Sequence, residues 1–555
     1  MPADNLSRDL LQRPMKAEER AIASAMRPRL SLKVGRFALP LVCVALLLYA
    51  FVLLRTAWLC DEAYLTFRTA YNLVNGFGPT WNVAERVQAF THPLWMLLLS
   101  GLYALTREMY LTPLLLSVAL SLAAAWFFAF RVARTPGAAV LGLCIWSGSR
   151  AFVDYSTSGL ESPLAHLLLL VLFLALAHAW RAVQVGLLLS AVLLLRTDFL
   201  ILLLPALVFW FRSQEGGPGK MRPLLLGLAP FFLWHGFALL YYGSLLGNPV
   251  VARLNTGIAP KELARQGLVY LQESIHFDPL TLPVIGLGCI AAASLAWRLR
   301  AMAIGILLYL AYVVAIGGDF MSGHLFSAPL VWAAALLIRA LERLPRAVEW
   351  SLAVPVLVAG LLAPYPSLTS GGDYGLDRGN DFDDARKAAK EIVGEDGIAD
   401  ERAWNYRLTG LCRVELDGLH PIAPLAEHPR YQEVQRLVAS GKKLITPDAV
   451  GLRGYYLGPG VHLVDASGQA DPLLARLPVA SGAVFRSHFK RSLPSGYEKS
   501  LEAGENKLKD TNLAGVYDAL RLVTRGPLFD RARLWEIVRL NTGRHRSAIA
   551  AYAND

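Results

Sequence analysis

Long uncharged runs of apolar residues constrain this chain more than any other feature. The first extends from Phe37 to Leu54, and a helix of that length crosses the roughly 30 Å of hydrocarbon in a bilayer. The chain is 55% hydrophobic and only 17% charged, which is too apolar for a soluble protein of its length. We predict a polytopic α-helical membrane protein with about 11–12 transmembrane helices. The apolar runs lie near 37–57, 93–106, 112–130, 137–150, 163–180, 184–196, 199–211, 223–243, 281–297, 301–316, 325–340 and 350–363.

The basic residues predict how these helices are oriented. Eight Lys and Arg residues precede the first run, which places the N-terminus in the cytoplasm. A signal peptide is the alternative, but no small-residue cleavage site follows the run. Arg131 and Arg134 also look cytoplasmic, which requires that one of the runs 93–106 and 112–130 does not fully cross. Three basic connections should lie on the same side: 212–222, 297–300 and 339–346.

The chain divides by composition into three parts. These are a basic cytoplasmic tail at 1–36, a transmembrane domain at 37–363 with a first outer loop at 58–92, and a polar C-terminal domain at 364–555. The polar part starts with a Gly/Asp-rich linker at 370–373 and should lie outside the cell. We predict a soluble α/β domain, because a strand-like stretch at 461–464 alternates with helical patterns. The apolar residues at helical spacing are Leu513, Val516, Tyr517 and Leu520, then Leu534, Ile537 and Val538.

The charge and the cysteines give no sign of a nucleic-acid interface, a disulfide framework or a cysteine-based metal site. The net charge of +11 is concentrated partly in the N-terminal tail and in short connections, where a membrane surface explains it without nucleic acid. The five cysteines form no disulfide or metal-ligand pattern. No metal site is predicted, although acidic loop residues could hold a divalent cation.

Two adjacent carboxylates, Asp61 and Glu62, stand where the first helix should leave the bilayer. Such a pair is costly at a membrane interface without a partner. If the segment is helical, Asp61 and Arg68 share one face, so that an acid or base would stand beside an anion clamp. The simpler alternative is a capping or salt-bridge pair in a solvated loop, and the spacing alone slightly favours that alternative.

Further polar residues lie at the outer ends of the predicted helices. Each of the charged residues among them either takes part in the function or forms an ion pair with another charged residue, which offsets the cost of its place near the membrane. The guanidinium groups of Arg196 and Arg253 are suited to bind a lipid phosphate. His92 could form a hydrogen bond with a phosphate, or it could have only the structural role of capping the next helix. Trp81 suits stacking on a sugar, although aromatic residues at an interface are more often anchors. The remaining candidates are Glu161, Asp198, Asp319 and His324.

Several motifs together resemble the GT-C glycosyltransferases, and within them the bacterial branch that contains the terminal arabinofuranosyltransferases. In the first two-thirds of the chain the motifs are Asp61-Glu62, Gly76-Phe77-Gly78, Glu85-Arg86-Val87, Thr91-His92-Pro93, Ser158-Gly159-Leu160-Glu161 and Gly317-Gly318-Asp319-Phe320-Met321. In the last third they are Asp400-Glu401-Arg402-Ala403, Leu408-Thr409-Gly410-Leu411, Gly454-Tyr455-Tyr456-Leu457-Gly458-Pro459 and Asp471-Pro472-Leu473-Leu474-Ala475-Arg476-Leu477-Pro478.

The resemblance implies a multi-pass protein of the bacterial inner membrane that transfers a sugar, with inversion, from a polyprenyl-phosphate donor to a cell-envelope glycan. It implies that an acidic residue of the first outer loop acts as the base, with Asp61 favoured over Glu62. The candidates for binding the donor phosphate are Arg68, His92, Arg196, Arg253 and His324. Relatives often carry Asn where this chain has His92, and Pro-Glu or Pro-Asp at 197–198, so the identity of the sugar stays open.

Three other functions are compatible with these residues. The same fold could transfer another sugar, or use a protein or lipid acceptor. A non-enzymatic membrane scaffold or flagellar motor-control protein would use its polar domain to bind a partner. A transporter is the third alternative, but the two halves show no inverted repeat. In the polar domain the aromatic residues more often belong to a core than to a carbohydrate cleft: Trp404, Tyr406, Tyr455 and Tyr456.

Overall fold

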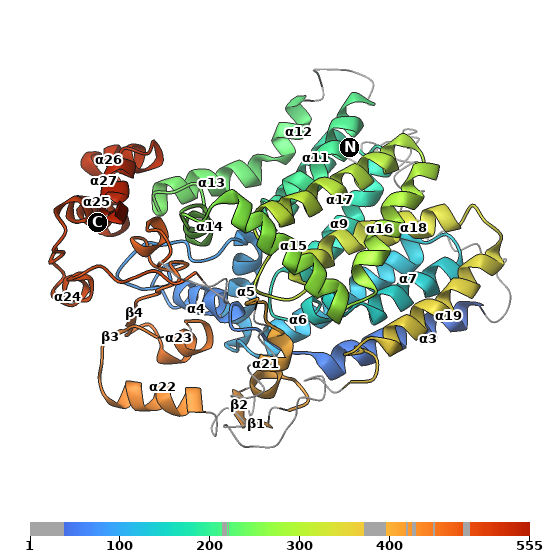
Figure 1. The fold of residues 1–555 in the computed structure, drawn as a ribbon, viewed down its shortest axis with the longest axis horizontal. Coiled ribbons are helices and arrows are strands. Elements are labelled where there is room, and N and C mark those ends of the chain that lie inside the picture. Colours follow the sequence, from blue (N-terminus) through green and yellow to red (C-terminus); the bar gives the residue numbers. More distant parts are fainter. Residues whose placement is uncertain are drawn as a thin grey trace, which may run out of the picture.

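A computed structural model describes most of the chain, and it is mostly helical. The described residues are 38–213, 219, 221–370, 396–413, 415–417, 420–423, 429–447, 450–480 and 489–554. The predicted cytoplasmic tail and most of the predicted linker lie outside them. Figure 1 shows a bundle of helices in blue to yellow, with the C-terminal part in orange and red gathered at one side.

Every predicted apolar run coincides with a helix. The helices of the bundle are α3 (Ala38–Thr56), α5 (Pro93–Thr106), α6 (Leu111–Phe127) with a π-helical turn (Phe128–Val132), α7 (Pro136–Gly148), α9 (Ser162–Ala177), α10 (Ala182–Leu195), α11 (Phe199–Arg212), α12 (Met221–Gly227), α13 (Ala229–Tyr241), α16 (Thr281–Ala291), α17 (Trp297–Ala315), α18 (Ser327–Leu341) and α19 (Arg346–Leu362). Between them lie α4 (Ala63–Val74), α8 (Arg150–Tyr155), α14 (Asn248–Leu254), α15 (Pro260–Phe277) and short 3-10 turns at Ala292–Ser294 and His324–Phe326.

Several of these helices can cross a membrane, but the predicted number is not shown. In the described residues four stretches are long and apolar enough: Leu39–Thr56, Leu111–Val132, Trp297–Ala315 and His324–Leu341. Two helix pairs qualify only as bent spans, namely α12 with α13, which are bent by 54°, and α15 with α16, which are bent by 104°. Five further apolar helices have fewer than 18 residues. The architecture is therefore compatible with a polytopic membrane protein.

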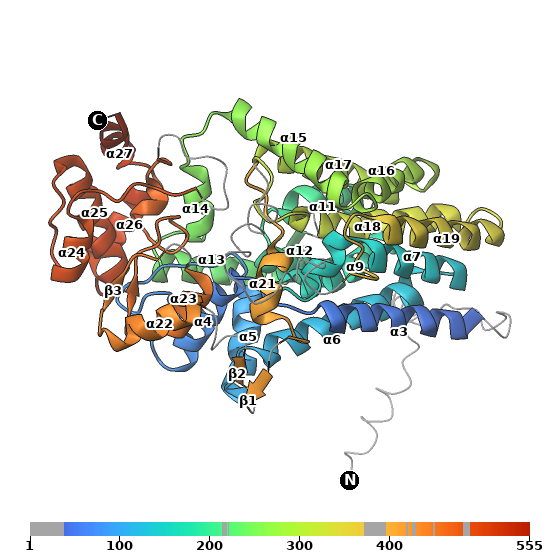
Figure 2. The same ribbon diagram turned by 60° about the horizontal axis from the view of Figure 1, so that its bottom comes forward.

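Helix α5 begins and ends at the same end of the bundle. At its start, the Nε2 atom of His92 lies 2.6 Å from Thr66 Oγ1 of α4. At its end, Arg107 Nη1 lies 3.4 Å from Asn75 Oδ1, just after α4. Figure 2 shows α5 lying across the direction of α3 and α6. Helix α5 is also one of the apolar helices too short to qualify as a membrane span, whereas Leu111–Val132 qualifies. This is compatible with the prediction that one of the runs 93–106 and 112–130 does not fully cross.

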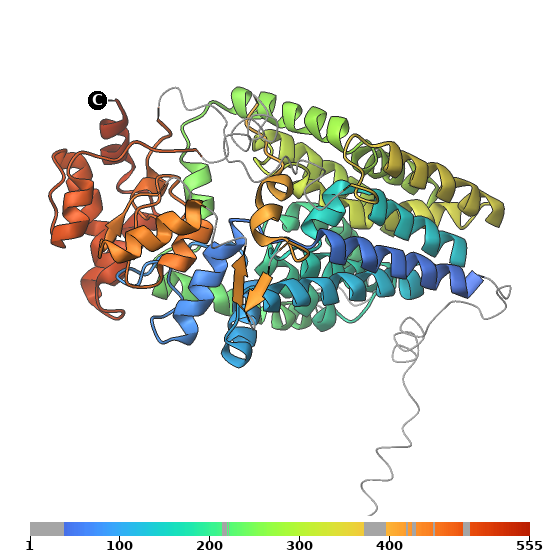
Figure 3. The ribbon, with the colours of Figure 1, turned by 90° about the horizontal axis from the view of Figure 1, so that it is seen from below.

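The basic connections meet at the opposite end. The backbone NH of Arg134 donates to Glu342 Oε1 at 2.6 Å, and the guanidinium of Arg343 donates to the carbonyl of Ser294. These bonds join the connections before α7, before α17 and after α18. Figure 3 shows the bundle extending from the orange and red C-terminal part toward this far end. These three connections therefore share one end of the bundle, which is compatible with the positive-inside rule for a single membrane face. The connection 212–222 lies mostly outside the described residues.

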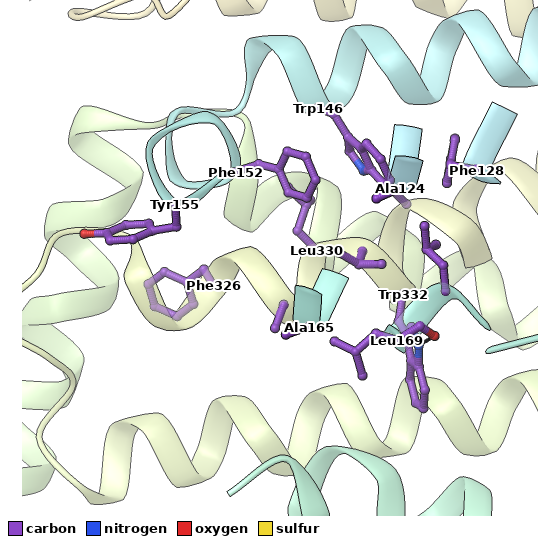
Figure 4. Packing of buried hydrophobic residues seen from close by; sticks show 14 of the residues in the cluster. Ala124, Phe128, Trp146, Phe152, Tyr155, Ala165, Leu169, Phe326, Leu330 and Trp332 are labelled. Carbon is purple, nitrogen blue, oxygen red and sulfur yellow. Dashed lines mark hydrogen bonds between the residues drawn. The ribbon is translucent and has the colours of Figure 1, made fainter. Parts of the chain in front are cut away.

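Large aromatic side chains fill the centre of the bundle. The rings of Trp146 and Phe152 stack with centroids 4.5 Å apart, and the indole NH of Trp332 donates to the carbonyl of Leu169 at 2.9 Å. Figure 4 shows these side chains pointing into the space between α7, α8, α9 and α18, together with Leu330. Rings of this size bury more apolar surface than any other side chain, so they hold these helices together.

In its described residues the C-terminal part is mainly helical, and an α/β domain is not shown. Its helices are α21 (Glu401–Thr409), α22 (Pro429–Ala439), α23 (Gly451–Leu457), a 3-10 turn (Leu474–Arg476), α24 (Tyr497–Ala503), α25 (Thr511–Arg525), α26 (Arg531–Asn541) and α27 (Arg546–Asn554). Its strands are β1 (Glu415–Asp417) antiparallel to β2 (His420–Ala423), and β3 (Leu444–Ile445) parallel to β4 (His462–Leu463).

Two local predictions for this part can be compared with the structure. The strand predicted at 461–464 is limited to the two residues of β4. The first helical pattern is confirmed, since its four apolar residues are buried on α25. The second pattern also lies on a helix, α26, but only Ile537 of its three residues is buried.

The C-terminal part and the first outer loop share a hydrophobic core. Leu65 and Trp81 of the loop pack in one cluster with Leu457 and Leu463 from the C-terminal part. A further residue, Tyr406, is only 2% exposed and joins the core of the bundle. Because both segments bury apolar surface against each other, the position of the C-terminal part is set by the loop.

Candidate active site

A cavity of about 600 Å³ opens where the bundle, the first outer loop and the C-terminal part meet. Its volume is typical of small-molecule sites. It is lined by residues at the start of α4 and α5, between α10 and α11, on α14, between α17 and α18, and from the C-terminal part. Eight of the eleven predicted site residues line it: Glu62, His92, Glu161, Arg196, Asp198, Arg253, Asp319 and His324.

One side of the cavity carries two carboxylates and a histidine. Glu62 directly precedes α4, and His92 is the residue before α5. The Nδ1 atom of His92 lies 3.3 Å from Glu161 Oε2, at the start of α9. Burial lowers the pKa of His92 below its ordinary value, although the charge of Glu161 acts in the opposite direction. The imidazole is therefore neutral at neutral pH.

A second group of lining residues is organised around Arg196. Because α10 ends at Leu195 and α11 begins at Phe199, a tight corner brings Arg196 against Asp198. Their two bonds measure 3.1 Å for Nε to Oδ1 and 2.7 Å for Nη2 to Oδ2. Such a bidentate pair fixes the plane of the guanidinium. The hydroxyl of Tyr309 also donates to Asp198, at 3.2 Å. The carboxylate of Asp198 is thus already engaged in holding Arg196.

A second pair, Asp319 and His324, lies beside Arg196. His324 Nδ1 is 2.8 Å from Asp319 Oδ2, and its Nε2 is 3.5 Å from Arg196 Nη1. Burial alone would raise the pKa of the Asp319 carboxyl, but the hydrogen bond from His324 and the positive charge of Arg253 hold this pKa below its ordinary value. Asp319 is therefore ionised, and the imidazole donates from Nδ1.

Arg253 holds the loop that carries this pair. Its guanidinium donates to the carbonyl of Ile316 at 3.2 Å and to that of Gly318. Gly318 has φ +69°, and a Cβ there would lie 2.5 Å from the side chain of Tyr270. Only glycine fits such a position without strain. The loop is thus shaped by close packing on one side and by an arginine from α14 on the other.

Asp61 does not line the cavity, although it is adjacent to Glu62. Its carboxylate accepts hydrogen bonds from the backbone NH groups of Leu452 at 2.9 Å and Gly451 at 3.1 Å. These groups open helix α23, whose first NH groups have no partner within the helix. This geometry corresponds to the alternative in which Asp61 caps a helix and does not act as an acid or base.

Arg68 and Trp81 also lie outside the cavity. Arg68 donates from Nε to the carbonyl of Trp81 at 3.0 Å, from Nη1 to Gly454 at 2.6 Å and from Nη2 to Val461 at 2.7 Å. Its guanidinium carbon lies 4.6 Å from the centre of the Trp81 ring, which is fully buried. Burial lowers the pKa of Arg68 to about 9. The two residues join the first outer loop to the C-terminal part.

The sequence analysis did not single out the residues that the C-terminal part contributes to the cavity. These are Ser467, Gln469, Phe489 and Arg491. The aromatic residues weighed there, Tyr406, Tyr455 and Tyr456, pack instead against the core of the bundle. Ser467 and Gln469 are neutral polar residues outside a regular element, and such residues produce no periodic pattern in the sequence. Phe489 and Arg491 are single residues in a polar stretch and belong to no recognisable motif.

A metal centre finds no obvious ligands in the described residues. Within that part of the chain, no three or more His, Cys, Asp or Glu residues are grouped so as to hold a metal ion. In the cavity, the oxygens of Asp198 and Asp319 already accept hydrogen bonds from cationic or imidazole groups.

Comparison with known proteins gives one informative match. No protein-family model matches the chain, and no solved structure matches it significantly. A stretch of 114 residues is 34% identical to a terminal β-(1→2)-arabinofuranosyltransferase of Corynebacterium glutamicum. This match supports a relationship to a glycosyltransferase. It covers 19% of this chain and only 16% of the length of that relative. The match and the apolar helices are together compatible with a membrane protein that is related to a glycosyltransferase.

Proposed function

We propose that this protein transfers a sugar, with arabinofuranose as the first candidate, from a polyprenyl-phosphate donor to a cell-envelope glycan, with inversion at the anomeric carbon. The observation that carries the proposal is the cavity, which combines a carboxylate at Glu62 with the arginines Arg196 and Arg253. Basic connections near Arg134, Ser294 and Arg343 lie at the far end of the bundle, and by the positive-inside rule this distribution supports a cavity at the outer face of a bacterial inner membrane.

The donor phosphate would bind beside Arg196 and Arg253. A polyprenyl-phosphate sugar is a phosphodiester with one negative charge, and its phosphate acquires a second charge when the bond to the sugar breaks. Cationic groups that are already in place stabilise such a developing charge. In this scheme Asp198 and His324 position Arg196, and Asp319 orients the imidazole of His324. His92 and Glu161 would contact the sugar on the other side.

Glu62 is the base that the geometry favours. It lines the cavity, whereas both oxygens of Asp61 accept backbone hydrogen bonds at the start of α23. The acceptor hydroxyl would lose its proton to Glu62 while its oxygen bonds to the anomeric carbon, and the bond between that carbon and the phosphate oxygen would break. Attack from the side opposite the leaving phosphate inverts the anomeric configuration. The products are the extended glycan, polyprenyl phosphate and a proton on Glu62.

The decisive experiment is transfer by the purified full-length protein in detergent. Radiolabelled polyprenyl-phosphate arabinose and a short arabinan are supplied to the wild type, Glu62→Gln and Asp61→Asn. We expect product from the wild type, none from Glu62→Gln, and substantial product from Asp61→Asn. Retained turnover in Glu62→Gln with loss in Asp61→Asn would transfer the role of base to Asp61.

The choice of donor separates the remaining functions. Product with a different polyprenyl-phosphate sugar, but not with arabinose, would retain the enzyme class and discard the sugar. Transfer only to a protein or lipid would discard the glycan acceptor. An absence of turnover with every lipid donor would contradict the proposal and favour the membrane scaffold or flagellar motor-control protein considered above.

A further inference from the structure

Helix α26 and the residues just before it carry large apolar side chains that project outward. Phe529 is 76% exposed and Trp535 is 66% exposed, and Leu534 and Val538 are exposed as well. Leu534 and Val538 belong to the helical pattern noted in the sequence, whose third member, Ile537, is buried. Single exposed apolar residues are common, but a group of large ones marks a surface that contacts a partner or a membrane.

Three of these side chains form one apolar stripe along α26. Val538 lies one helical turn after both Leu534 and Trp535, so the three side chains share a face. The opposite face of the helix points inward, since Arg533 and Ile537 are buried there. Helix α26 is therefore amphipathic, and its stripe faces away from the residues against which the helix packs.

The inward face of α26 is fastened to the end of α13. Arg533 donates from Nη2 to the carbonyl of Leu240 at 2.8 Å and to that of Tyr241 at 3.0 Å. The side-chain amide of Asn541, at the end of α26, donates to the carbonyl of Gly243 at 2.8 Å. Figure 1 shows α26 in red next to the end of the green helix α13. The position of the stripe is therefore tied to this end of α13.

The composition of α13 indicates where the membrane surface lies. Together with α12 it qualifies as a bent span, and it exposes Phe232, Leu233 and Phe237. The helix ends at Tyr241, and Tyr242 follows it. Tyrosine is enriched where a helix passes from hydrocarbon to water. The hydroxyl of Tyr242 also donates to the backbone of the first outer loop at 2.8 Å. The end to which α26 is fastened is thus typical of a membrane–water interface.

The chain around the stripe is basic. Residues 531–546 contain five arginines and one glutamate. Two of these arginines, Arg531 and Arg539, are exposed on α26 beside the stripe. An apolar stripe that is bordered by arginines is typical of a helix that lies in the plane of a membrane surface. Its apolar side chains enter the boundary between headgroups and acyl chains, and its cations attract anionic lipids.

We propose that α26 is an interfacial anchor, which inserts Phe529, Trp535 and Val538 into the headgroup region of the outer leaflet and contacts anionic phospholipid. A second copy of the chain would bring a second set of the same arginines to the stripe, and like charges repel each other. Anionic lipid neutralises them instead. The anchor holds the C-terminal part at the membrane surface, and it does not depend on which sugar, if any, the protein transfers.

A spin label on α26 tests the anchor. The exposed cysteines are first removed by Cys43→Ser and Cys412→Ser. The full-length protein then receives Val538→Cys or the matched control Val438→Cys, is labelled with a nitroxide, and is reconstituted into vesicles of phosphatidylcholine and phosphatidylglycerol. Val538 is 49% exposed and Val438, on α22, is 54% exposed, so the protein itself shields the two positions similarly. The background protein without a new cysteine gives the signal to subtract.

Oxygen is concentrated in lipid, whereas a nickel chelate stays in water. We expect the ratio of nitroxide relaxation by oxygen to relaxation by the chelate to be severalfold higher at position 538 than at position 438. Equal ratios would show that the stripe faces water and would overturn the proposal. A label at 538 that neither reagent reaches would also overturn it, because a second copy or a partner protein would then cover the stripe. Leu534→Cys, on the same stripe, replaces Val538→Cys if that variant does not fold.

Discussion

The Nδ1 atom of His324 lies 2.8 Å from Oδ2 of Asp319, and the Nε2 atom of the same imidazole lies 3.5 Å from Arg196 Nη1. The carboxylate therefore determines which imidazole nitrogen faces the arginine. Asp319 and His324 are separated by a glycine-containing turn, so their pairing depends on the shape of that turn. The pair connects the loop before α18 with the corner between α10 and α11.

Removing the charge of Asp319 should weaken donor use specifically. In Asp319→Asn the imidazole of His324 can adopt the wrong orientation, and Arg196 loses a fixed neighbour. We expect kcat/KM for the polyprenyl-phosphate donor to fall roughly ten- to a hundredfold, the usual cost of a hydrogen bond to a charged group. The acceptor KM should change little. His324→Gln should have a similar effect, and the double variant should be no worse than either single one if the two residues act as a unit.

Asp61 should contribute to stability, not to chemistry. Its carboxylate caps the start of α23, so Asp61→Ala should lower the free energy of unfolding by about 0.5–2 kcal/mol, as observed for other caps. Thermal unfolding in detergent would measure this change. Asp61→Asn retains an oxygen that can accept one of the two hydrogen bonds and should lose less stability. An unchanged unfolding temperature with abolished transfer would reverse this assignment.

Arg68 should be essential for the contact between the first outer loop and the C-terminal part. Arg68→Leu removes the donor to the carbonyls of Gly454 and Val461, each at a cost of about 1–3 kcal/mol. The carbonyl of Trp81 keeps a hydrogen bond from Asn72 Nδ2 at 3.1 Å. Limited proteolysis should then cut the C-terminal part at lower temperature than in the wild type. Glu433→Gln, which removes the partner of Arg453 at a carboxylate that is 46% exposed, is the control and should change stability by less than about 1 kcal/mol.

His92 should make the protein sensitive to mild acid. Because burial lowers the pKa of His92 in the folded state below its ordinary value of 6.5, the unfolded chain takes up a proton first as the pH falls. The folded state therefore loses stability as the pH decreases through 6.5 toward the lower folded pKa. His92→Gln should flatten this part of the profile when unfolding temperatures are measured from pH 7.5 to pH 5. Parallel profiles for the two proteins would contradict the assignment.

Asn248 should stabilise the position of the loop 465–471. Its side-chain amide donates to the carbonyls of Gly468, Gln469 and Asp471, so Asn248→Ala should lower the free energy of unfolding by about 1–3 kcal/mol. Asn248→Gln keeps the amide but shifts it by one methylene, and it should recover part of this loss if the amide is what matters. Thermal unfolding in detergent measures both changes, and an unchanged unfolding temperature in Asn248→Ala would contradict this role.

The helices and most of the candidate site followed from local features of the sequence. Each of the twelve apolar runs became a helix, because burying an apolar stretch in lipid requires its backbone groups to bond internally. Ionised residues at helix ends, such as Glu161, Arg196 and Asp319, had to find partners near the membrane surface, and they meet in one cavity. The predicted α/β domain is not shown by the structure. Short polar segments carry only weak strand signals, and long-range packing overrides them.

The sequence by itself determined where the apolar helices lie and that charged residues stand at their ends. Hydrophobic burial and the cost of an unpaired charge act on each segment separately, so a local pattern is enough to predict both. It did not determine which of Asp61 and Glu62 faces the cavity, because neighbouring residues at the start of a helix point in different directions. That choice was made when α23 supplied two NH groups to Asp61. In the same way, Ser467 and Gln469 reached the cavity only when the C-terminal part packed against the first outer loop. Contacts between residues almost 400 positions apart, such as those of Asp61 with Gly451 and Leu452, decide which side chains face the cavity. A local sequence pattern cannot predict such contacts.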